Sequence, residues 1–124
     1  FEVGHYGDPA FDVGFCLTHL VLKAIHLPAR RALLLDSVHE FWEFYSATMR
    51  MKYGATLGNE LPRLEHRTIQ HLAGCLVARV HGKSPVDYLT PPEQLRAVQL
   101  AEKLFALGPA ATWAETFALL QREI

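Results

Sequence analysis

FEVGHYGDPAFDVGF, residues Phe1–Phe15, decides how this chain is interpreted, because an apolar–acidic–apolar triplet leads through a Gly-Asp-Pro turn into a helix. Asp8 suits a helix N-cap, and Pro9 then takes the first helical position, where proline's missing N–H costs nothing. The apolar run that follows predicts a helix to about Leu27, ended by Pro28. Since the sequence starts without an initiator methionine or a polar tail, we expect it to begin inside a larger domain.

The next two segments are also helical in pattern. A helix over about 29–51 places large apolar residues on one broad face, and another over about 62–81 repeats that spacing. Between them, residues 53–60 hold two glycines and the only asparagine, which predicts a loop. Gly82 is placed to end the later helix.

Two further helix starts carry the same local signal. Thr90-Pro-Pro-Glu93 and Thr112-Trp-Ala-Glu115 both fit a capping box, with threonine at the N-cap and glutamate three residues later. They predict helices near 91–107 and 113–123, separated by Gly108-Pro109. Apart from a possible extended start at Phe1–Val3, no segment has the pattern of a strand. We therefore expect an all-α fold of about five helices.

Composition limits the function classes. At 124 residues and 14.0 kDa, with half of its residues hydrophobic, the chain forms a single helical unit over residues 1–124. A net charge of -1 and a pI near 6.7 argue against nucleic acid as a partner, which would need a basic patch.

Membrane and secretory signals are also weak. The apolar run 9–27 contains Asp12, His19 and Lys23, so it predicts a buried helix and no membrane span. No basic region typical of a signal peptide precedes it. Cys16 and Cys75 lie in apolar runs, which predicts two buried thiols in a reducing compartment. We expect a cytoplasmic protein.

The segment His39–Tyr45, with sequence HEFWEFY, is the best candidate for a binding surface. Helical spacing also allows plain packing, in which three aromatic residues form a core-facing stripe: Phe41, Trp42 and Tyr45. The polar residues of the segment then face solvent or a cleft: His39, Glu40 and Glu43.

Seven histidines raise the possibility of a metal-binding helical bundle. His66 and His71 are five residues apart, however, and so diverge around a helix, whereas two ligands on one face need a spacing of three or four. His39, beside two glutamates, would supply one side of a metal site. Scattered surface or packed histidines fit the pattern better.

The residues Phe1-Glu2, followed by Tyr6-Gly-Asp-Pro-Ala-Phe-Asp12 and an apolar helix, resemble the aminoglycoside phosphotransferase and choline kinase superfamily, which includes methylthioribose kinases. The stretch 78–89 (ARVHGKSPVDYL) is similar to a helix-to-loop segment of these proteins. The resemblance spans most of the chain and is strongest over Phe1–Lys23. It implies the C-terminal helical subdomain of a kinase-like phosphotransferase, whose intact form uses Mg²⁺ and ATP to phosphorylate a hydroxyl-bearing metabolite.

The resemblance also implies roles for a few residues. Asp12 corresponds to the buried aspartate that hydrogen-bonds the backbone of the catalytic loop in kinase-like folds; alternatively, it is a first-turn aspartate that satisfies free N–H groups. Glu2 corresponds to the glutamate after the metal-binding aspartate and would lie near magnesium in the intact enzyme. The acceptor wall of these enzymes is often acidic or aromatic, which points to four residues of the aromatic-rich segment: His39, Glu40, Trp42 and Glu43.

The departures from the family pattern concern catalysis. Family members need a His-Gly-Asp-x-x-x-x-Asn loop, yet no histidine here is followed two residues later by aspartate, and Asn59 lacks that context. A Gly-rich phosphate loop and a candidate nucleotide-binding lysine are also missing from the sequence. We therefore expect this chain alone to be inactive and without a cofactor, and to be completed by the upstream part of the same protein. The alternative is a non-enzymatic helical interaction module that self-associates through exposed apolar surface.

Overall fold

A computed structural model describes residues 9–57, 60–83 and 85–124 of the chain. It contains five α-helices and one short 3-10 helix, and the described residues include no strand. The all-α prediction with about five helices is therefore confirmed. In chain order the elements are α2 (Pro9–His26), η1 (Pro28–Arg30), α3 (Arg31–Leu57), α4 (Glu60–His81), α5 (Pro91–Ala106) and α6 (Trp113–Glu123).

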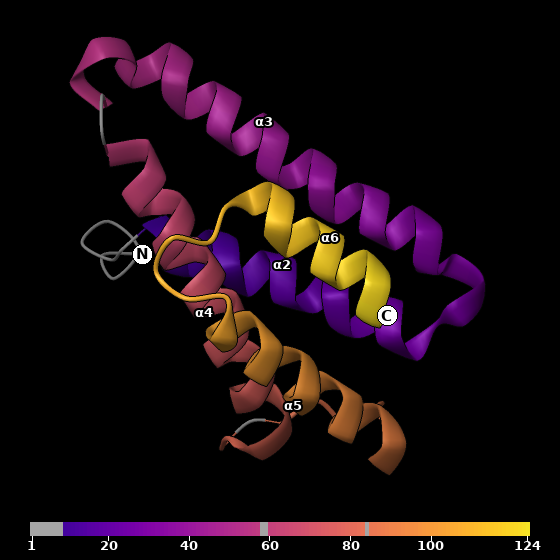
Figure 1. The fold of residues 1–124 in the computed structure, drawn as a ribbon. Helices are drawn as coiled ribbons and strands as arrows, with labels where there is room; N and C mark the ends of the chain where they lie inside the picture. Colours follow the sequence, from indigo (N-terminus) through magenta and orange to yellow (C-terminus); the bar gives the residue numbers. More distant parts are fainter. Residues whose placement is uncertain (1–8, 58–59, 84) are drawn as a thin grey trace.

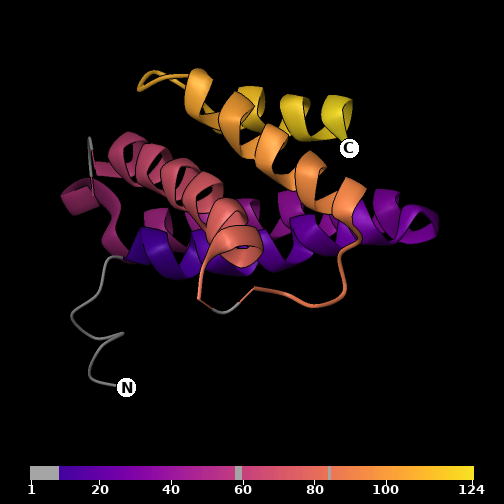
Figure 2. The same ribbon diagram turned by 90° about the horizontal axis from the view of Figure 1, so that it is seen from below.

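The helices form two layers. Helices α2, α3 and α4 lie together, and α5 and α6 cover one side of them (Figures 1 and 2). Helix α2 packs against α3, α4 and α5, while α6 contacts α3, α4 and α5. The centre of the core consists of fully buried aliphatic residues from several helices, among them Leu17, Leu22, Leu72, Leu76, Leu100, Leu104 and Leu120. Helix α3 lies along one edge of the bundle, so only part of its surface is covered (Figure 1).

Pro28 makes the corner between α2 and α3, as expected. It opens η1, because proline cannot continue a helix but fits a first helical position. The Arg31 side chain then reaches back: its Nε donates to the Ala24 carbonyl oxygen at 3.0 Å, and a terminal nitrogen donates to Ile25 at 3.4 Å. These bonds satisfy carbonyl groups that the end of α2 leaves free.

The close packing of α2 on α4 depends on Gly14. A Cβ atom at this position would lie 2.8 Å from the Cβ of His71 and 3.0 Å from the backbone nitrogen of Leu72. Next to it, the buried Thr18 hydroxyl donates to the Gly14 carbonyl oxygen at 2.7 Å and so needs no partner from α4. The glycine therefore sets how near the two helix axes approach each other.

The end of α3 differs from the sequence-based expectation. We predicted that the helix stops near residue 51 and that 53–60 form a loop, but helical structure continues to Leu57. The chain instead kinks at Gly54, whose φ of 36° and ψ of -122° are accessible mainly to glycine. The glycine was thus a correct signal for a break, although the break is a single residue within a longer helix.

Both predicted capping boxes are present. At the start of α5, the Thr90 hydroxyl accepts from the Glu93 backbone N–H, and Glu93 accepts from the Thr90 N–H at 2.9 Å. At the start of α6, Thr112 and Glu115 make the same pair of bonds. Helix α4 ends at His81, just before Gly82, as expected. These local signals located helix ends to within one or two residues.

The cysteine prediction is half wrong. Cys75 is buried and burial raises the pKa of its thiol, but Cys16 is exposed on α2. Position 16 lies in an apolar run, yet helix geometry turns it away from the core that Val13 and Leu17 enter.

In the part of the chain that the structure describes, no single helix is long and apolar enough to cross a bilayer. Pro9–His26 and Pro28–Lys52 meet that criterion only when taken as a pair, and they are bent by 119° relative to each other.

Candidate functional site

The candidate residues near the start of the chain are described only in part. Glu2 and the predicted cap Asp8 lie outside the described residues. Asp12 is exposed in the first turn of α2, whereas the resemblance implied a buried aspartate. This position suits the interpretation as a first-turn aspartate, because a carboxylate there interacts favourably with the free N–H groups of the helix. Its role beside a catalytic loop stays a prediction.

Trp42 belongs to the core. Only 3 % of its surface is exposed, and its ring stacks on Trp113 of α6 with centroids 5.5 Å apart. The Tyr45 ring lies tilted beside that of Trp42, with centroids 6.2 Å apart. The packing interpretation of the aromatic stripe is therefore correct for Trp42, and this residue does not form part of a surface wall.

His39 is half-buried and turned towards α6. Its Nδ1 accepts a hydrogen bond of 3.2 Å from the indole Nε1–H of Trp113, and its ring lies 4.7 Å from that of Phe117. An indole nitrogen can only donate, so this bond requires a His39 ring whose Nδ1 carries no proton. We had expected His39 to face solvent or a cleft with the glutamates; instead it helps to hold α6 on α3.

Glu40 and Glu43 are exposed, on the side of α3 that faces away from Trp42. The four residues suggested as an acceptor wall therefore divide into two pairs. One pair, His39 and Trp42, supports the fold, and only the two carboxylates are free to meet a ligand or another protein surface.

An aromatic patch on α2 and α4 was not predicted. The exposed Phe11 and Phe15 rings stack with centroids 6.1 Å apart, and His71 of α4 meets Phe11 edge-on at 5.4 Å. Arg79 lies over Phe15, with its guanidinium carbon 5.9 Å from the ring centroid, and His19 packs on the same ring at 4.7 Å. Partial burial, reinforced by the charges of Arg79 and Lys23, lowers the pKa of His19.

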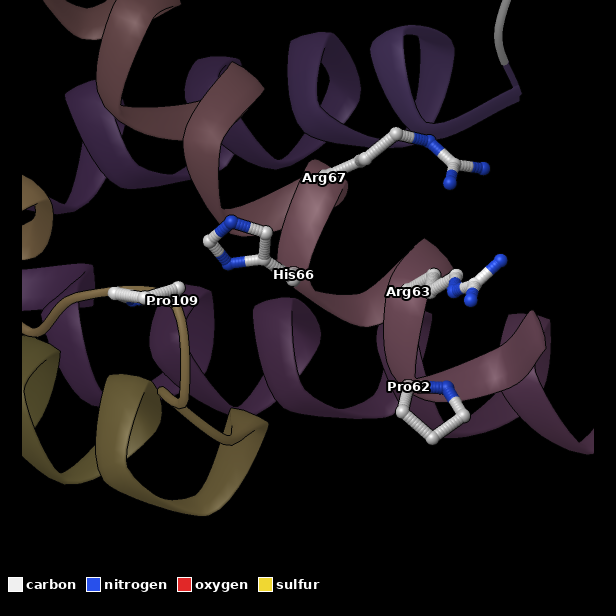
Figure 3. Close-up of a pocket in the computed structure, with 5 residues that line it drawn as sticks. All are labelled: Pro62, Arg63, His66, Arg67 and Pro109. Carbon is white, nitrogen blue, oxygen red and sulfur yellow. The ribbon is translucent and has the colours of Figure 1, made fainter. Parts of the chain in front are cut away.

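Two hollows adjoin each other between the start of α4 and the segment that joins α5 to α6. One, of about 350 Å³, is lined by Pro62, Arg63, His66, Arg67 and Pro109 (Figure 3). The other, of about 340 Å³, shares Pro62 and Pro109 and extends to Arg50 and Glu65. Helix α6 begins at this second hollow, where the Glu65 carboxylate accepts from the Trp113 backbone N–H at 2.6 Å.

The basic residues of the first hollow do not converge. The Arg63 and Arg67 side chains extend to one side, whereas the His66 ring points the other way, towards Pro109 (Figure 3). Arg63 is paired with Glu60 at 3.2 Å. Two guanidinium groups and an imidazole directed at one point would make a strong anion site, but this arrangement spreads them apart.

A polar cluster lies where the end of α2 and the last turns of α4 approach residues 85–93. His26 Nδ1 lies 3.0 Å from the Glu93 carboxylate, and its ring packs on Tyr88 at 5.1 Å. Burial raises the pKa of Tyr88, whose hydroxyl is buried without a hydrogen-bond partner, as is Nε of Arg79. A bridging water would satisfy such groups. This cluster ties α5 to the rest of the bundle.

Within residues 9–57, 60–83 and 85–124, no three histidine, cysteine, aspartate or glutamate side chains come together to hold a metal ion. The metal-binding bundle that the seven histidines suggested has no support in these ranges. Among the described histidines, His19, His39 and His71 pack on aromatic rings, and His26 lies beside a carboxylate and an aromatic ring.

No protein-family model matches the sequence, and comparison with curated proteins and with solved structures also gave no significant match.

Proposed function

We propose that the chain is the C-terminal helical part of a small-molecule phosphotransferase of the aminoglycoside phosphotransferase and choline kinase type. One observation carries the proposal: the Tyr6–Asp12 motif leads into α2, which begins within it at Pro9 and packs against three other helices. The resemblance implies a central helix after this motif, and α2 has that position among the described helices. The intact protein would act in the cytoplasm, with Mg²⁺ and ATP as cofactors.

We propose a loop-holding role for Asp12 although it is exposed among the described helices, where the resemblance implies a buried aspartate. Its carboxylate lies at the start of α2 and is not covered by the other described helices, so it is available to accept hydrogen bonds from the backbone of another segment. In the proposed role, Asp12 holds a catalytic loop in place and does not touch the substrate. Small displacements of such a loop are costly to phosphoryl transfer, which depends on positioning.

The exposed carboxylates of α3 are the residues that we propose for acceptor contact. Glu40 and Glu43 carry negative charge and are accessible, whereas Trp42 and His39 are engaged in packing. Two carboxylates close together favour a cationic acceptor, because opposite charges attract even at an exposed site. The substrate class would be a hydroxyl-bearing metabolite with an amino or ammonium group.

The test begins with the reading frame upstream of Phe1. The proposal predicts an in-frame sequence that encodes a His-Gly-Asp-x-x-x-x-Asn loop and an aspartate codon directly before Phe1. A start codon at this boundary would contradict it. The protein expressed from the longer frame should then bind MgATP in a calorimetric titration, whereas residues 1–124 alone should not.

A variant of that longer protein tests the role of Asp12. The Asp12→Asn substitution should lower kcat with little change in the KM for ATP, because a positioning residue acts through the loop that it holds. The matched control is Asp87→Asn, an exposed aspartate between α4 and α5. Equal kcat values for the two variants would refute the role.

A second candidate function is a helical interaction module that self-associates. It is favoured by large apolar side chains that the fold leaves exposed on α3, namely Leu33, Phe44 and Met51. Measurement of the oligomeric state distinguishes it from the first candidate, which makes no demand on association.

A further inference from the structure

The outward side of α3 carries a regular stripe. The outer stripe consists of Leu33, Ser37, Glu40, Phe44, Ala47 and Met51, and its members alternate between spacings of four and three residues. That alternation is the seam pattern of a two-helix coiled coil. Three of its apolar members are among the most exposed large residues of the protein: Leu33 at 63 %, Phe44 at 73 % and Met51 at 87 %.

No described helix covers this stripe. Helix α3 lies along one edge of the bundle, with the other helices on its inner side (Figure 1). The stripe residues are exposed except for Ser37, which is half-buried and whose hydroxyl donates back to the Leu33 carbonyl oxygen at 3.1 Å. Large apolar side chains exposed along one row, here with Ser37 and Glu40 between them, are typical of a contact surface.

Charged residues flank the outer stripe at a heptad interval. Asp36, Glu43 and Arg50 are seven residues apart on one border of the stripe, and all three are exposed. An acidic residue therefore begins the row and a basic residue ends it. When two such helices run antiparallel, the same border of each helix meets, so the start of one row faces the end of the other.

We propose that two copies of this chain associate through the outer stripes of their α3 helices, antiparallel about a two-fold axis. The midpoint lies near position 42 of each helix, which places Leu33 of one copy opposite Met51 of the other. Ser37 then faces Ala47, and Glu40 faces Phe44. In the same register Asp36 lies beside Arg50 of the second copy, and symmetry makes this ion pair twice.

The antiparallel arrangement is favoured over a parallel one by charge. A parallel pairing in register would bring Glu40 against Glu40 of the second copy inside the seam, where two carboxylates repel each other. It would also leave Asp36 and Arg50 without opposite charges across the interface. The antiparallel register places each Glu40 opposite Phe44 and brings each Asp36 beside Arg50 of the second copy.

Two contacts weaken the proposed dimer, and the first is that of Glu40 with Phe44, where the seam takes a carboxylate out of water. In the second, the two Glu43 side chains meet across the two-fold axis, and like charges at an exposed site cost up to about 1 kcal/mol. Glu43→Gln should therefore tighten self-association, by up to about fivefold in the dissociation constant, the factor equivalent to that energy. A loss of affinity in this variant would contradict the assigned register.

Sedimentation equilibrium over a range of protein concentrations tests the dimer. The unmodified chain should show a monomer–dimer equilibrium, and Phe44→Asp should remain monomeric because it places a charge at the centre of the seam. Leu95→Asp is the matched control, since Leu95 is also exposed, at 58 %, but on α5. It should dimerise as the unmodified chain does, and circular dichroism should show that both variants are folded.

Two results would overturn the proposal. In one, the unmodified chain stays monomeric at all concentrations; in the other, the Phe44→Asp and Leu95→Asp variants dimerise equally. The measurement needs no nucleotide or acceptor. Because the dimer covers Glu40 and Glu43, it excludes acceptor contact at these two residues, but the outcome of the measurement is separate from the MgATP titration and the upstream reading frame that test the proposed phosphotransferase.

Discussion

The two sides of α3 carry similar residues but have different surroundings. The inner side places Val38, Trp42 and Ser46 in the core, each 3 % exposed or less. The outer side places Phe44 and Met51 in solvent, at 73 % and 87 % exposure. Packing in the fold explains why the inner residues are apolar or small, because α2 and α6 cover that side. It does not explain the outer apolar residues, which no described helix covers. Their regular spacing therefore points to a contact beyond the fold.

The strongest test of the comparison removes one aromatic ring from each side. Trp42→Ala should lower the free energy of unfolding by about 3–5 kcal/mol, because it leaves a cavity beside Trp113 and Tyr45. Phe44→Ala should change it by no more than about 0.5 kcal/mol at concentrations where the chain is monomeric. Thermal or urea unfolding measures both, and equal losses would mean that the two sides are not different.

A smaller loss is expected when the inner side is perturbed indirectly. Thr112→Ala removes the N-cap of α6, the helix that presents Trp113 to α3, and should cost about 0.5–2 kcal/mol. Thr48→Ala, at an exposed position on α3, is the control. Because loss of α6 docking also changes the environment of two stacked tryptophans, fluorescence should report the effect. An unchanged unfolding midpoint for Thr112→Ala would show that α6 contributes little to the stability of the packing on the inner side of α3.

The smallest effect concerns acid stability. Hydrogen bonds from the Thr90 N–H and from His26 lower the pKa of Glu93 in the folded chain. The folded state therefore holds the Glu93 proton less tightly than the unfolded state does. The stability that results is present above the ordinary pKa of about 4.5, and it is lost as the pH falls below that value. Glu93→Gln should lower stability near neutral pH and flatten its decline in acid relative to the unmodified chain. An acid profile identical to that of the unmodified chain would contradict this assignment.

Local signals in the sequence predicted the helix ends well. The capping boxes at Thr90 and Thr112 and the break at Pro28 depend on neighbouring residues, so their geometry follows from a few positions. Gly54 was also a correct local signal for a break. Its consequence for α3 was not predicted, because whether a chain resumes its helix after a kink depends on what the next turn packs against.

The candidate site was harder to predict because its contacts are distant in sequence. His39 and Trp113 are 74 residues apart, so no helical pattern in α3 reveals that the imidazole accepts from an indole. Helix α3 also has apolar residues on two sides, and periodicity alone could not determine which side was buried. Only the position of α6 settles that Trp42 is inside and that Glu40 and Glu43 are outside.

The central claim is that the outer side of α3 joins two copies in one antiparallel register. A charge-reversal cycle measured by sedimentation equilibrium tests it most directly. Asp36→Lys and Arg50→Glu should each weaken the dimer, because each places like charges across the interface, while the double variant should regain affinity close to that of the unmodified chain. A double variant no tighter than either single variant would contradict the account.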